Sequence, residues 1–214
     1  MIQPPKFSTK LHKTRLTDGF FQAHEEYSHL RIEGGHWAAE SADSVMMSQV
    51  QLHEASLDAS TLYAPKLTDV RLTQCNLANT TCERIIAHRT EWLTCQLIGL
   101  NVTEGHFQNV VFRDCHLEWA RFRFCSFKAV TFEACNLKHA NFQGADLSGV
   151  RFKHCDLSEA EMSQAKLVGT DFRTSTIEGI RVGATEVVGA VVDHMQAAYM
   201  ASLLGLVIKS DDEV

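Results

Sequence analysis

The sequence of 214 residues lacks the long apolar runs and basic clusters that mark several large classes of protein. It has no stretch of about eighteen apolar residues and no apolar segment near its start, so we expect no transmembrane helix, no secretion signal and a cytoplasmic location. Acidic residues outnumber basic ones by 26 to 20, and the formal net charge is -6. This balance disfavours direct binding of nucleic acid or of an acidic membrane surface.

Sequence signatures of the common enzyme classes are also missing. The chain contains no GxSxG, HExxH, Walker or GxGxxG motif. Its seven cysteines include no CxxC pair, and their odd number does not fit a disulfide framework. We therefore expect a protein that is not an enzyme and that has no cofactor and no metal site.

An apolar residue at every fifth position dominates what the sequence does contain. This pattern begins at Tyr27 and continues without exception to Val192. A period of five is neither the 3.6 of an α-helix nor the alternation of a long strand. We expect each five-residue unit to form a short strand and then a corner, with the apolar residue, here called the centre, pointing inward.

A second period, of 20 residues, indicates how many units close one turn. Cysteine recurs at this interval from Cys75 to Cys155, and leucine does so from Leu57 to Leu157. Stacked turns of a solenoid repeat their residue types at the length of one turn. Four five-residue units are therefore expected to form one square coil.

Many of these units follow the motif of the pentapeptide-repeat family, which is a small residue, Asp or Asn, Leu or Phe, and two variable residues. The sequence resembles that family over residues 25–194. The resemblance implies an all-β fold, a right-handed quadrilateral β-helix with four pentapeptides in each 20-residue coil. The clearest copies are Cys135-Asn136-Leu137, Ala140-Asn141-Phe142, Ala145-Asp146-Leu147 and Cys155-Asp156-Leu157.

The repeat divides the chain into three parts. Residues 1–24 are expected to form an N-terminal cap or an irregular first coil, and residues 25–192 to form the β-helix. Residues 193–214 are expected to contain a short C-terminal α-helix and a tail that caps the stack or forms a dimer. The last acidic residues of this tail are expected to be frayed, namely Asp211, Asp212 and Glu213.

The N-terminal part keeps the five-residue step but loses its phase. Leu11, Leu16 and Phe21 are spaced by five, whereas the next centre, Tyr27, follows after six residues. This spacing indicates one inserted residue in an irregular first coil. Four basic residues against one acidic residue give this part a net charge of +3, which we interpret as a solvated end.

Helix signals stand near the C-terminus. Asp193 can cap the start of a helix, Gln196 is at the capping-box position, and Gly205 can end the helix. This end is similar to that of family members that protect DNA gyrase, in which a terminal helix and tail build a two-fold dimer. Capping of the monomer and contact in a homodimer remain alternatives for the apolar residues of this segment, which are Met195, Tyr199, Leu203, Leu206 and Ile208.

The row of cysteines from Cys75 to Cys155 admits two interpretations. Adjacent coils lie about 4.8 Å apart, within reach of a disulfide or of a shared metal ion. Each cysteine, however, occupies the small inward position where other units have Ala, and a straight row cannot surround a tetrahedral ion. We expect packing rather than a metal site, and we expect the eleven histidines to be solvated surface residues.

Acidic residues gather on the wall that carries the cysteine and leucine columns, where Lys138 is the single basic residue. The gyrase-protecting relatives are thought to mimic DNA. The resemblance therefore implies that this wall occupies the DNA site of DNA gyrase or topoisomerase IV and gives self-protection or quinolone tolerance. The predicted partner-binding residues are Asp58, Glu118, Asp156, Glu159 and Glu178.

An alternative function is that of a scaffold or adaptor that binds another protein through its flat walls. Two exposed aromatic side chains beside two arginines, expected on one outer corner, are typical of protein interfaces. Ordinary corner packing is the other interpretation of this cluster. The cluster consists of Trp119, Arg121, Arg123 and Phe124.

Overall fold

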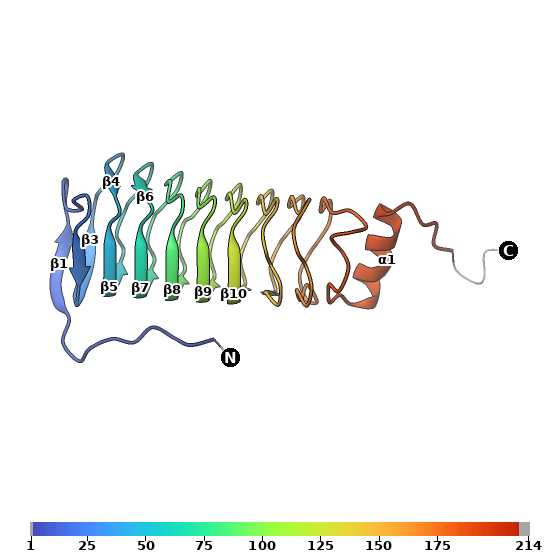
Figure 1. The fold of residues 1–214 in the computed structure, drawn as a ribbon, viewed down its shortest axis with the longest axis horizontal. Coiled ribbons are helices and arrows are strands. Elements are labelled where there is room, and N and C mark those ends of the chain that lie inside the picture. Colours follow the sequence, from blue (N-terminus) through green and yellow to red (C-terminus); the bar gives the residue numbers. More distant parts are fainter. Residues whose placement is uncertain (1, 210–214) are drawn as a thin grey trace.

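The chain winds into a parallel β-solenoid that ends in a short α-helix (Figure 1). The computed structural model describes residues 2–209, so the predicted frayed tail at Asp211, Asp212 and Glu213 lies outside the described residues. Within 2–209, no helix is long and apolar enough to cross a membrane. The elements are β1 (His12–Leu16), β2 (Glu26–Ser28), β3 (Leu30–Gly35), β4 (Ser41–Asp43), β5 (Met46–His53), β6 (Thr61–Tyr63), β7 (Lys66–Thr73), β8 (Ile86–Leu93), β9 (His106–Arg113), β10 (Ser126–Glu133), β11 (Arg151–Lys153) and α1 (His194–Leu203).

A constant register of 20 residues links successive coils. Strands β7 and β8 pair in parallel so that Leu72 lies beside Trp92, and the same offset recurs in the pairs from β5 to β11. Isolated bridges continue it as far as the pair of Asp171 and Val191. Four five-residue units therefore form each coil, and the predicted quadrilateral β-helix is confirmed.

Corners occur at the second residue after each centre, where the backbone is left-handed. Glu54, for example, has a φ of 53° and Ala59 a φ of 55°. This conformation costs most residues about 1–2 kcal/mol, and ladder hydrogen bonds offset the cost, as when Glu54 N donates to Thr73 O at 3.0 Å. The residue types at the corners are consequently varied.

The corners of a coil are not all alike. At many of them the chain makes a tight turn in which the third residue after the centre donates back to the centre, as Ala140 N does to Leu137 O at 3.0 Å. At one corner of the earlier coils a single eight-residue strand instead bends in its middle, at Asp69 in β7 for example. This second kind of corner, here called the seam, consists of residues 49, 69, 89, 109 and 129.

The inward columns form the core. Every fifth residue from Ile32 to Ile177 is buried. Aromatic rings in one column stack directly, with centroids 4.8 Å apart for Phe112 and Phe132 and 5.2 Å apart for Phe132 and Phe152. The interior is thus packed with side chains, and the side chains free to contact other molecules lie on the outer faces.

The first coil departs from the 20-residue register. Thr14 pairs with Ile32 and Leu16 pairs with Gly35, offsets of 18 and 19 residues. One inserted residue after Phe21 would have lengthened this coil, so the predicted insertion is wrong. The coil is shortened, and a register shift within β1 absorbs the difference.

Residues 2–9 form an extended segment, here called the N-terminal strap, that runs back along the solenoid from the hinge before β1 (Figure 1). It lies across the seam, where Lys6 N donates to Asp69 Oδ1 at 2.8 Å, and Pro5 is buried. The four basic side chains of residues 1–24 are exposed, as predicted for a solvated end, but the backbone of residues 2–9 lies against the wall. Main-chain contacts hold it against the wall despite its exposed lysine.

Helix α1 closes the C-terminal end of the stack. Asp193 caps it in the predicted capping box with Gln196. The Gln196 side chain also donates to two carbonyls of the last coil, Phe172 O at 2.8 Å and Ser175 O at 2.7 Å. Tyr199 contributes as well, because its hydroxyl accepts from Gly179 N at 2.6 Å.

Of the apolar residues for which capping and dimer contact were alternatives, only Tyr199 packs against the stack within residues 2–209. Met200 is buried, with Gln196, whereas Met195 is 69% exposed and Leu203 is 42% exposed. The end of the stack is therefore capped by Gln196, Tyr199 and Met200. The other four residues are exposed and form an apolar end together with Leu204 and Val207. These four are Met195, Leu203, Leu206 and Ile208.

Candidate interaction surface

The predicted acidic surface lies on the Cys/Leu wall, which comprises residues 55–59 and their equivalents at intervals of 20. All five predicted carboxylates project from this wall or its edge, but they are spread along the rod. Three of them form no ion pair within residues 2–209, and these are Asp58, Glu118 and Glu178. The negative charge of the wall is thus distributed rather than concentrated in one patch.

The other two acidic residues have cationic or titratable neighbours. Lys138 Nζ lies 3.3 Å from Asp156 Oδ2. Partial burial raises the pKa of Asp156, but hydrogen bonds from Ser158 and the Lys138 ammonium outweigh it, so the pKa falls below its usual value. Glu159 Oε2 lies 3.4 Å from His139 Nδ1. These two carboxylates are therefore held in fixed positions on the wall.

A ladder of side chains runs along one edge of the Cys/Leu wall. Trp119, His139 and Glu159 occupy the same corner in three successive coils. The Trp119 and His139 rings stack with centroids 4.0 Å apart, and His139 contacts Glu159. His139 is therefore not the freely solvated residue that we expected, and the exact 20-residue spacing of the three is the signal that could have revealed the ladder.

The predicted aromatic and arginine cluster does not form a single corner. Trp119 and Phe124 lie at successive corners, with φ values of 60° and 56°, and the buried Phe122 lies between them. The cluster spans the whole Phe122 wall, which comprises residues 120–124 and their equivalents. The Arg123 guanidinium lies 5.3 Å from the Phe124 ring, so that aromatic and cation contact each other at the second corner.

The Phe122 wall and the ladder enclose a shallow hollow of about 350 Å³. Trp119 forms one side of it and is 59% exposed, which is unusual for an indole. Arg121 and Arg181 contribute positive charge, and Glu159 and Glu161 contribute negative charge. This mixture of a large aromatic ring with both charge signs suits contact with a protein more than with a nucleic acid.

The cysteines are free and buried. In the row from Cys75 to Cys155, the thiols donate to backbone carbonyls, as Cys115 Sγ does to Trp92 O at 3.3 Å. Burial raises the pKa of Cys82 and Cys125, outside that row, to about 12. In the part of the chain that the structure describes, no three His, Cys, Asp or Glu side chains are placed to share a metal ion. The geometry of the thiols is that of small core side chains.

Two family profiles match the repeated region. Residues 65–142 match the profile described as a pentapeptide repeat region, and residues 135–173 match the one described as pentapeptide repeats in 8 copies. The chain belongs to the pentapeptide-repeat family. In this pentapeptide-repeat protein, the coils before residue 65 and the C-terminal helix lie outside the matched region.

Solved structures of other proteins are similar to this chain at low sequence identity. A trypsin-treated form of QnrB1, a plasmid-mediated fluoroquinolone resistance protein, has a TM-score of 0.58 and 19% identity and covers 93% of this chain and 99% of its own. A second trypsin-treated QnrB1 variant has a TM-score of 0.50 and 18% identity, with 94% and 97% covered. HetL, involved in heterocyst differentiation regulation in the cyanobacterium Nostoc sp. strain PCC 7120, has a TM-score of 0.38 and 17% identity, with 78% and 88% covered. No curated protein sequence matches this chain significantly.

Proposed function

We propose that this pentapeptide-repeat protein is a non-enzymatic modulator of DNA gyrase or topoisomerase IV that competes with DNA through its Cys/Leu wall. The observation that carries the proposal is the solenoid itself, which presents carboxylates along one wall and shares its fold with QnrB1 over nearly the full length of both chains. Self-protection or quinolone tolerance would be the biological result.

The electrostatics of the wall support competition with DNA in a positively charged groove. Asp156 and Glu159 are held by their neighbours, and Glu178 extends the same wall by one coil. Fixed charges lose little side-chain freedom on binding and attract a basic surface over about 10 Å at moderate ionic strength. The rod holds the charges in a line, and the charges favour binding through the Cys/Leu wall rather than through another wall.

The test is a titration of gyrase supercoiling and quinolone-dependent cleavage with the purified protein. We expect inhibition by the natural chain and at least about tenfold weaker inhibition by the triple variant Asp156→Lys, Glu159→Lys, Glu178→Lys, because each reversal replaces attraction by repulsion. All three side chains are at least partly exposed, so the variant should keep its circular dichroism spectrum.

A matched control reverses three exposed carboxylates on other parts of the solenoid. Glu26→Lys, Asp43→Lys, Glu104→Lys changes the net charge by the same amount, and we expect its inhibition to stay within about twofold of the natural chain. If both triple variants lost inhibition equally, the effect would be due to net charge and not to the Cys/Leu wall. Full inhibition by the first triple variant would refute the role of the Cys/Leu wall.

A scaffold or adaptor function is favoured by the hollow beside Trp119. An indole that is 59% exposed and stacked on His139 is a preformed contact residue. If this is the functional surface, affinity capture with the natural chain should retain a partner protein, and the chain should have no effect on gyrase. Trp119→Ala should weaken binding of that partner by about 2 kcal/mol or more. A partner that binds both chains equally would exclude Trp119 as the contact.

We also place a homodimer contact at the exposed apolar end of α1 and its tail. Leu206, Val207 and Ile208 are 57–82% exposed and follow directly on the helix, forming a contiguous apolar segment. Two copies related by a two-fold axis would bury this segment against itself. Sedimentation equilibrium measures the mass, and a monomer at all concentrations would contradict the contact.

A further inference from the structure

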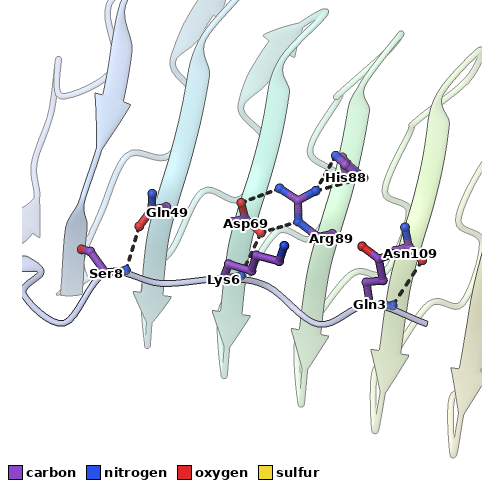
Figure 2. Close-up of polar contacts among 8 residues, drawn as sticks. All are labelled: Gln3, Lys6, Ser8, Gln49, Asp69, His88, Arg89 and Asn109. Carbon is purple, nitrogen blue, oxygen red and sulfur yellow. Dashed lines mark hydrogen bonds and ion pairs between the residues drawn. The ribbon is translucent and has the colours of Figure 1, made fainter. Parts of the chain in front are cut away.

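The N-terminal strap is bound to the seam as a peptide is bound to a groove (Figure 2). It crosses the strands instead of pairing with them, and three of its backbone N–H groups donate to side chains of the seam. Ser8 N donates to Gln49 Oε1 at 2.7 Å, and Gln3 N donates to Asn109 Oδ1 at 3.2 Å. Lys6 N donates to Asp69 between them.

The acceptors have a regular origin in the fold. Gln49, Asp69 and Asn109 occupy the left-handed bends of the eight-residue strands β5, β7 and β9, so their side chains belong to one row along the rod. Asp69 and Asn109 are only 6% and 8% exposed beneath the strap. The row is therefore a line of amide and carboxylate oxygens that take main-chain donors.

Asp69 is preorganised by the fourth member of the row. Arg89 Nε donates to Asp69 Oδ1 at 2.6 Å and Arg89 Nη2 donates to Asp69 Oδ2 at 2.7 Å (Figure 2). This hydrogen bonding from Arg89 lowers the pKa of Asp69, against the opposing effect of burial. An acceptor held by a bidentate pair does not have to be ordered when a peptide binds.

Side chains of the strap add a simple pattern to these main-chain contacts. Pro5 is buried, and the Phe7 ring lies 5.4 Å from the Arg71 guanidinium carbon. A proline stiffens an extended chain, and an aromatic ring two residues later covers a cation. The strap therefore presents the sequence pattern proline-x-aromatic, in which x is any residue.

The seam has an unfilled end where the strap stops. Ile2 borders a hollow of about 140 Å³ whose lining includes Ala129, Thr131 and Gly149. The bent-strand corner changes to a tight turn there, since Val150 N donates back to Leu147 O at 2.9 Å. The groove is therefore of finite length and slightly longer than the segment that occupies it.

We propose that the seam is a binding site for an extended segment of another protein carrying a proline-x-aromatic sequence, and that the N-terminal strap is its built-in competitor. The site is two corners away from the Trp119 ladder in every coil, so it is separate from both surfaces assigned above. A ligand must displace the strap, and its apparent affinity falls in proportion to the fraction of molecules with a free seam.

The experiment uses the full chain and a fluorescent peptide with the sequence of residues 2–10 as the probe. Phe7→Ala in the full chain weakens the attached strap and leaves every seam residue intact. Fluorescence anisotropy should show the probe binding this variant on the order of tenfold more tightly than it binds the natural chain. A probe with Lys6→Pro, which lacks the N–H that Asp69 accepts, should bind the variant on the order of tenfold more weakly.

Each other outcome overturns the proposal. A folded Phe7→Ala chain that binds the probe no better than the natural chain would show that the seam does not accept peptides. Equal binding of a scrambled probe would show nonspecific attraction. Sedimentation of the same proteins tests exchange of straps between two copies, because a dimer of the natural chain that Phe7→Ala abolishes would assign the seam to a second copy.

Discussion

Phe132→Ala is expected to lower the free energy of unfolding by about 3–5 kcal/mol. The ring is fully buried and stacks between Phe112 and Phe152, so its removal leaves a cavity that rigid neighbouring coils cannot close. Each coil contacts only its neighbours, and a defect in mid-stack therefore weakens the interfaces on both sides. Denaturation with guanidinium, followed by circular dichroism, gives the free energy.

Cys115→Ala is the matched control, on the neighbouring wall of the preceding coil. Its side chain is 1% exposed, but the change removes a single sulfur atom, and Ala already fills the equivalent position at Ala55. We expect a loss of about 1 kcal/mol or less. A loss as large as that of Phe132→Ala would contradict the conclusion that the cysteine row serves as packing.

Gly35→Ala is expected to detach or unfold the first coil, with a loss of more than about 3 kcal/mol. Gly35 has a φ of 96°, and a Cβ there would overlap the backbone of Leu16, its partner across the pairing of β1 and β3. The left-handed strain alone is worth about 1–2 kcal/mol. The clash can be relieved only by separating the two strands, which hydrogen exchange would detect as lost protection of the β1 amides.

Gly149→Ala isolates the effect of the backbone conformation. Gly149 has a φ of 72°, yet a Cβ at this position would meet no atom within 4 Å. We expect a loss of only about 1 kcal/mol. If the two variants lost similar amounts of unfolding free energy, the φ angle alone would explain both losses, and the expected effect of the clash with β1 would be too large.

The candidate surfaces could be predicted in part from the sequence. The position of each side chain within its five-residue unit placed Asp58, Glu118 and Glu178 on one outer wall, as the structure shows. The ladder of Trp119 and His139 required two residues 20 apart to be considered as neighbours. The sequence left open which side of α1 packs, because the buried polar Gln196 bonds to backbone carbonyls, which a search for an apolar stripe does not detect.

The N-terminal strap left no signal in the sequence for a physical reason. Its contacts join residues 41, 63 and 106 positions apart, and the strap contributes backbone N–H groups that every residue except proline has. The shortened first coil was hidden for a similar reason, since Leu16 keeps the five-residue step while its partner is Gly35.

The sequence by itself determined the five-residue unit, the four-unit coil and the identity of the buried columns. Those features depend on local geometry, because each unit must turn at the same point and face its apolar residue inward. Only the tertiary structure decided the path of the strap, the register of β1 and the face of α1 that closes the stack. These depend on which distant backbone groups remain unpaired once the solenoid has formed.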